Sequence, residues 1–126
     1  MILVLLSACN SIFIVAQAVT VNTTIDSAQI WIGQQTKLSF EMTQQPKQFV
    51  QSPVFSDVIV DGIELVERVK ADTTQSPDGQ LIIKQSYVVT AFEDSLFLIP
   101  SFPFISGQDT IWSNPVSLKV IQPFVI

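Results

Sequence analysis

Strict alternation of apolar and polar residues is the feature that most limits what this chain can fold into. Within residues 36–43, Leu38, Phe40 and Met42 alternate with charged, hydroxyl-bearing or otherwise polar side chains. Side chains that repeat every two residues lie on one face of a β-strand, so the segment predicts a strand with one buried and one solvated face. No long segment shows the 3.6-residue period of a helix. The chain is therefore predicted to be all-β.

The rest of the chain shows the same kind of pattern, in short apolar or β-branched runs bounded by Gly, Pro, Asn, Asp and Ser. Pro100 and Pro103 interrupt one of these runs, which marks it as an edge strand or a kinked one. About seven strands with regular turn signals predict an antiparallel sandwich of the immunoglobulin-like kind. The expected strands are 19–25, 36–43, 58–60, 63–70, 81–92, 96–105 with its break, 110–113 and 116–121.

Residues 1–18 are expected to be a signal peptide. An apolar stretch ends there in Ala16-Gln17-Ala18, the small-residue pattern that signal peptidase cleaves. The usual cationic start is missing, so the leader is expected to be incomplete. Cys9 follows Leu6-Ser7-Ala8 and fits a lipobox, which leaves lipoprotein processing as the alternative. The mature chain, 19–126, is expected to be one exported domain in the periplasm or cell envelope.

Composition excludes several classes of function. The net charge is −5 and the six basic residues are scattered, whereas nucleic acids require a cationic face. The chain has no histidine, and its one cysteine lies in the leader, so the commonest general base and the commonest metal ligands are missing. The segment 72–76 (DTTQS) is close to a von Willebrand A metal motif, but that motif needs an α/β sheet, and we interpret the segment as a solvated loop. No enzyme activity, cofactor or metal is expected.

The order of several strand and turn segments is similar to one known family. The chain resembles the BatD (oxygen-tolerance) family over residues 19–121, through the segments WIGQQTKL (31–38), DGIELV (61–66), YVVT (87–90), FLIP (97–100) and WSNPVSLKV (112–120). The resemblance implies a periplasmic immunoglobulin-like domain that is associated with membrane proteins bearing von Willebrand A domains. It supplies no catalytic residues. The chain stops after one domain, so it is expected to be either a fragment of a longer protein or a free single-domain relative.

The expected function is protein binding at an open sheet edge. An edge strand can accept a strand from a partner, and apolar side chains dominate interface energies. The candidate anchors are Leu98, Ile99, Phe102 and Phe104. The expected partners are envelope proteins, such as von Willebrand A-domain proteins, or further domains of a longer chain. In the alternative arrangement these residues are core and the contact lies in an end loop such as 73–79.

A carbohydrate-binding sandwich is the rival function, with Trp31, Trp112 or Phe102 stacking on sugar rings. We expect both tryptophans to be core residues instead. A further pattern, Asp followed by Ser or Thr and then an aliphatic residue or Thr, occurs at four of the seven aspartates. It resembles an acceptor sequence for periplasmic O-glycosylation, although Asp, Ser and Thr also simply favour turns. The candidate acceptors are Ser27, Thr73, Ser95 and Thr110.

Overall fold

The computed structural model describes residues 19–123, so the predicted signal peptide and the lipobox at Cys9 lie outside the described residues. Every regular element in this part is a strand, and the prediction of an all-β fold is confirmed. The eleven strands are β1 (Thr20–Ile25), β2 (Gln29–Trp31), β3 (Gln35–Gln44), β4 (Val58–Val60), β5 (Ile63–Arg68), β6 (Asp72–Gln75), β7 (Leu81–Thr90), β8 (Ser95–Ile99), β9 (Pro103–Ser106), β10 (Asp109–Trp112) and β11 (Val116–Ile121).

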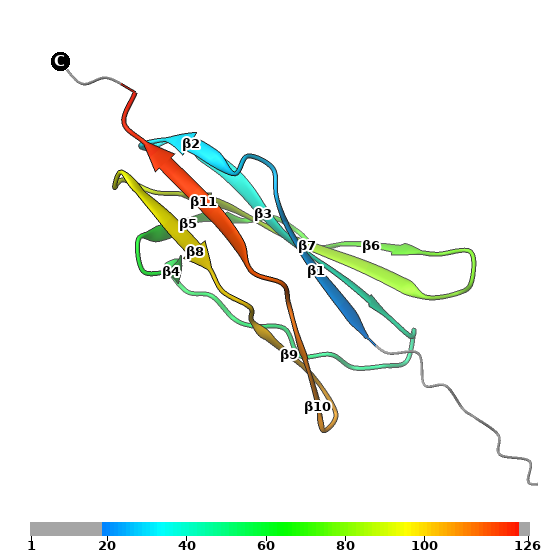
Figure 1. The fold of residues 1–126 in the computed structure, drawn as a ribbon. Helices are drawn as coiled ribbons and strands as arrows, with labels where there is room; N and C mark the ends of the chain where they lie inside the picture. The colour runs from blue at the N-terminus through cyan, green and yellow to red at the C-terminus, as the bar shows by residue number, and fades with distance from the viewer. Residues whose placement is uncertain (1–18, 124–126) are drawn as a thin grey trace, which may run out of the picture.

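The strands form two layers. The larger sheet has the order β1-β3-β7-β5-β4, and β6 pairs with the first part of β7. The smaller sheet has the order β2-β11-β8, and the β9–β10 hairpin projects from the end of β8 and β11 (Figure 1). Almost all pairs are antiparallel, but β2 runs parallel to β11. The chain crosses from the larger sheet to the smaller one between β1 and β2.

The centre of the larger sheet follows from the alternation in the sequence. β3 and β7 pair along ten residues each, with Leu38 opposite Tyr87 and Phe40 opposite Gln85. Inward residues of β3 and of the second half of β7 are buried, including Leu38 and Val89, which have no exposed surface. On the outer face, the small Ser39 is hydrogen-bonded to the hydroxyl of Ser86 at 2.8 Å.

The core lies between the two layers and takes residues from both. Each layer turns one apolar face inward, as a sandwich requires. The buried apolar residues are Val19, Ile30, Leu38, Phe40, Met42, Phe55, Ile59, Ile63, Tyr87, Val89, Ala91, Ile99, Phe104, Leu118 and Val120. Within residues 19–123, no helix is long and apolar enough to cross a membrane.

Two strands differ from the sequence prediction. Residues 72–76 were expected to be a solvated loop, but Asp72–Gln75 forms β6, which pairs with Leu81–Lys84 of β7. All four residues of β6 are exposed, so no apolar alternation marks the strand. β2 has only three residues and was also not predicted. The break at Pro100 and Pro103 separates β8 from β9, so the interrupted strand predicted over 96–105 becomes two strands.

Candidate functional site

The four residues predicted to form a binding edge are divided between surface and core. Leu98 on β8 is 64% exposed, whereas the next residue, Ile99, is fully buried. Phe104 on β9 is 3% exposed, and Phe102 packs partly buried against the core. Of the four, Leu98 alone is a surface residue by its exposure. Ile99 and Phe104 are therefore core residues and cannot act as surface anchors.

The alternation along β8 explains this division. β8 pairs with β11 in an antiparallel register that sets Leu96 opposite Lys119 and Leu98 opposite Ser117. Both leucines lie on the outer face of the smaller sheet, and Leu96 is 69% exposed. Leu96 was not named by the sequence reasoning, although its spacing of two residues from Leu98 was visible. The outer face of β8 therefore carries two exposed leucines beside a serine and a lysine.

The second edge of β8 has no strand beside it in the described part of the chain. The neighbouring β9 is partly covered, because Gln51 and Ile105 exchange two backbone hydrogen bonds of 2.8 and 3.0 Å. Beyond Gln51 the chain turns inward, and Phe55 enters the core. The edge of β9 is thus paired at one residue, while no strand within residues 19–123 pairs with the outer edge of β8.

The chain between β3 and β4, residues 45–57, is here called the strap. Phe55 anchors it among aromatic rings, with ring centroids 5.0 Å from Phe102, 5.2 Å from Tyr87 and 6.1 Å from Phe40. The Arg68 guanidinium donates a 3.2 Å hydrogen bond to the Phe55 carbonyl. These contacts fix the strap where it leaves β9.

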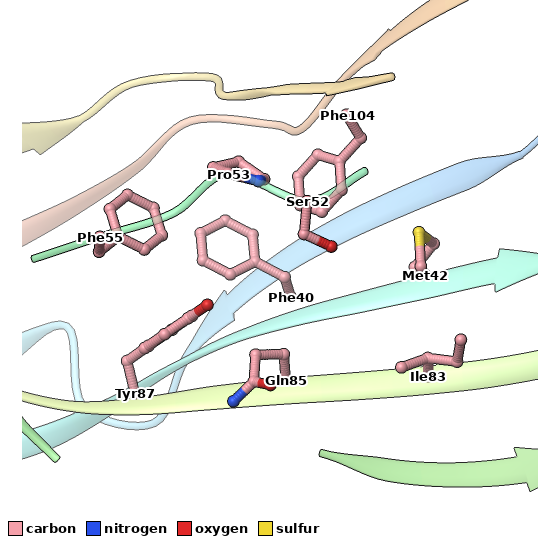
Figure 2. A pocket seen from close by; sticks show the side chains of 9 residues that line it. All are labelled: Phe40, Met42, Ser52, Pro53, Phe55, Ile83, Gln85, Tyr87 and Phe104. Atoms are coloured by element: carbon pink, nitrogen blue, oxygen red, sulfur yellow. The ribbon is translucent and has the colours of Figure 1, made fainter. Parts of the chain in front are cut away.

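A small cavity lies under the strap (Figure 2). Figure 2 shows the rings of Phe40, Phe55 and Phe104 on one side of it, with Ile83 and Tyr87 on β7 opposite. Its volume is about 20 Å³, and a site of that size holds roughly one water molecule. The cavity is therefore a packing gap in the core, with no room for a ligand.

Both tryptophans are on the surface, so the expectation that they fill the core is wrong. Trp31 is 55% exposed and Trp112 is 62% exposed. Trp31 lies opposite Ile121 at the far end of β11, and Trp112 lies just before the start of that strand at Val116. Six residues of extended strand span about 17 Å. The two rings are thus separated along β11 and do not form one flat platform.

The predicted acceptors for O-glycosylation are all on the surface. Ser27, Thr73, Ser95 and Thr110 are exposed, and three of them lie in the first two residues of strands. Ser95 is the first residue of β8 and is therefore beside the open edge. Their accessibility fits the modification, which stays a prediction.

The described residues show little sign of acid–base or metal chemistry. No three His, Cys, Asp or Glu side chains lie together within residues 19–123 as metal ligands would. The Ser76 hydroxyl donates a hydrogen bond to the Asp78 carboxylate and lowers the pKa of that group, but both lie at the exposed tip of the β6–β7 hairpin. Asp78 is thus part of a turn.

Comparisons of the chain with protein-family models, with curated proteins and with solved structures found no match. The resemblance to the BatD family, with the partners it implies, therefore stays a prediction.

Proposed function

We propose that this chain is a non-catalytic binding module of the bacterial cell envelope, and that it recognises another protein along β8. The observation that carries the proposal is the combination found at this strand, an unpaired edge with Leu96 and Leu98 exposed beside it. Main-chain hydrogen bonds to an added strand give affinity, and side chains on alternate positions give selectivity. The envelope location rests on the apolar leader with Ala16 and Ala18 and on the resemblance to the BatD family.

Four of the other sheet edges support the choice of β8, and the remaining edge strands, β2 and β10, each carry one exposed tryptophan and no exposed leucine. The edge of β1 is closed at Thr23 by the side chain of Asn114. β9 is bridged by Gln51. The pairing of β4 with β5 is irregular between Val58 and Val60, and β6 offers no apolar side chain. Proteins protect their edges by covering them, by bulges and by polar residues. Of the described strands, β8 is the one that keeps an open edge and two exposed leucines.

The test is an affinity pull-down from envelope extract. A Leu96→Ser/Leu98→Ser double variant is compared with wild type and with Val54→Ser/Val66→Ser, which removes two exposed apolar side chains elsewhere. We expect the leucine variant to lose the partner while the valine variant keeps it, with unchanged circular dichroism for both. If wild type binds neither an envelope protein nor a second copy of itself, or if the leucine variant keeps the partner, the proposal is wrong. The variants avoid Phe104, because replacing that core residue would unfold the protein.

A second function, carbohydrate binding, is favoured by the exposure of Trp31 and Trp112. Their separation along β11 allows each ring to stack on a sugar only by itself. Glycan-array binding that is lost in Trp31→Ala or in Trp112→Ala would favour this function over protein binding. Binding to the array that survives both substitutions would exclude stacking on either ring.

A further inference from the structure

The central residues of β8 read the same in both directions. The sequence Leu96-Phe97-Leu98 is symmetric about Phe97. If two such strands pair antiparallel around a two-fold axis at Phe97, then Leu96 of each copy lies opposite Leu98 of the other. We propose that the partner of this edge is a second copy of the chain, joined β8 to β8. The proposal rests on the proposed function, because it uses the same edge.

The pairing would bring the exposed leucines of both copies onto one face. Leu96 and Leu98 are both on the outer face of the smaller sheet, and opposed residues in an antiparallel pair are about 4.5–5.5 Å apart at Cα. The four leucines would then form two cross-strand pairs in one apolar patch, each shielded from water by its neighbours. The two three-stranded sheets, β2-β11-β8 in each copy, would become one six-stranded sheet. Such a two-fold contact uses the same patch on both copies and closes on itself.

The charges around β8 favour the antiparallel register. Glu93 and Asp94 precede the strand, and Pro100 and Ser101 follow it. Antiparallel pairing about Phe97 sets Asp94 of one copy opposite Pro100 of the other. A parallel, in-register pair would place the same acids side by side. Like charges directly opposite are destabilising, so the sequence around β8 selects the register that the leucines also require.

The ends of the strand limit the length of the contact between the two copies. Pro100 has no backbone N–H, so the ladder cannot extend past Ile99. The five-residue edge buries less than the roughly 800 Å² per partner of a standard interface. The association is therefore weak and depends on concentration. Each copy carries a net charge of −5, so added salt strengthens the dimer by screening the repulsion.

The first experiment is sedimentation velocity on the protein between roughly 10 µM and 1 mM, a range chosen for weak interfaces. We expect a shift from monomer to dimer with concentration, and a stronger shift at higher salt. Leu98→Lys should weaken association about tenfold or more, since an interface anchor is replaced by a charge. Val54→Lys alters an exposed apolar residue that is not on β8. It should leave association close to wild type, apart from the small effect of the added positive charge on the repulsion between copies. A monomer at all concentrations, or equal effects of both variants, overturns the proposal.

The second experiment tests the register, in a Cys9→Ser background that removes the native thiol. A mixture of Leu96→Cys and Leu98→Cys proteins is oxidised. Because each of these positions faces the other across the axis, we expect the mixed disulfide to form several times faster than either homodisulfide. A preference for homodisulfides overturns the register. If the protein stays monomeric but still loses an envelope partner when the leucines are replaced, then the second copy is not the partner and the proposed function holds. If the protein stays monomeric and the pull-down also fails, both proposals are wrong.

Discussion

The side-chain amide of Asn114 pairs with the backbone of Thr23 at the edge of β1. Its Oδ1 accepts a 2.7 Å hydrogen bond from the Thr23 N–H, and its Nδ2 donates a 3.0 Å hydrogen bond to the Thr23 carbonyl. One side chain thus satisfies both polar groups of a strand residue, as a neighbouring strand would. Next to it, the Ser113 hydroxyl accepts from the Phe102 N–H at 2.8 Å. Ser113 and Asn114 thus tie the segment that precedes β11 to Phe102 on one side and to β1 on the other.

We predict that Asn114→Ala lowers the free energy of unfolding by about 1–3 kcal/mol, because it leaves a partly buried backbone N–H and carbonyl without partners. Urea denaturation measures the loss, and amide exchange should accelerate at Thr23. Asn22→Ala is the matched control, since Asn22 is exposed on the same strand and its replacement should change stability by less than about 0.5 kcal/mol. Equal losses in the two variants would contradict a specific role for Asn114.

We predict that replacing Gly62 lowers the stability of the fold, because the ring of Phe97 lies against it. A Cβ added at Gly62 would lie 2.3 Å from Cε1 of the Phe97 ring, and the φ of Gly62 is +91°. Gly79 has a nearly equal φ of +87°, but a Cβ there would meet nothing within 4 Å. Gly79→Ala therefore measures the cost of the backbone conformation alone, about 1–2 kcal/mol. Gly62→Ala should cost a further 1–3 kcal/mol or so for overpacking.

Chemical denaturation of Gly62→Ala, Gly79→Ala and Gly62→Ala/Phe97→Leu checks this. The smaller leucine should recover part of the loss seen in Gly62→Ala. If Gly62→Ala and Gly79→Ala are equally stable, the ring of Phe97 moves aside at no cost and the close approach does not constrain β8.

Phe55 is predicted to hold the strap in place. It is 8% exposed and lies among three aromatic rings, whereas the preceding Val54 is 85% exposed. Phe55→Ala should therefore lower the free energy of unfolding by about 3–5 kcal/mol, and Val54→Ala should change it by less than about 0.5 kcal/mol. Thermal or urea unfolding separates the two. A small effect of Phe55→Ala would mean that the core closes over the gap without the strap.

Alternation predicted the fold well where one face of a strand is buried and the other is solvated. β3 and most of β7 follow it, and the inward residues of β3 were identified from the sequence. It failed at β6, because both faces of that strand are exposed and its position depends on pairing with β7. Strand pairing of this kind is a long-range contact and leaves no local pattern.

The candidate site was predicted only in part, for a related reason. All four residues from Leu96 to Ile99 are apolar, so the sequence does not show which pair faces the core. The register with β11 decides it, and adjacent residues such as Leu98 and Ile99 cannot both be outside. The tryptophans were expected in the core, but Trp31 takes an outward position of β2, with Ile30 buried instead.

Tyr87 is predicted to make stability depend on alkaline pH. Burial raises the pKa of Tyr87 above its usual value of 10.0, and the Arg68 guanidinium, 5.8 Å from the ring, lowers it in part. Below pH 10 the phenol is protonated in both the folded and the unfolded state, so its contribution to stability is fully present. Above pH 10 the unfolded chain ionises first. Stability is then lost as the pH rises through the folded pKa, by at most about 1.4 kcal/mol per pH unit.

The chain has one tyrosine, so absorbance of tyrosinate reports Tyr87 alone. We expect a midpoint above pH 10 in the folded protein, and a higher midpoint in Arg68→Gln, because the nearby positive charge that favours the phenolate is removed. Urea denaturation at pH 8 to 11 should show a loss of stability that is smaller in Tyr87→Phe, which keeps the ring but cannot ionise. Lysines also titrate in this range, and the difference between wild type and Tyr87→Phe removes their contribution. A midpoint at or below pH 10, or equal slopes for the two proteins, would show that the Tyr87 hydroxyl is hydrated in the folded state.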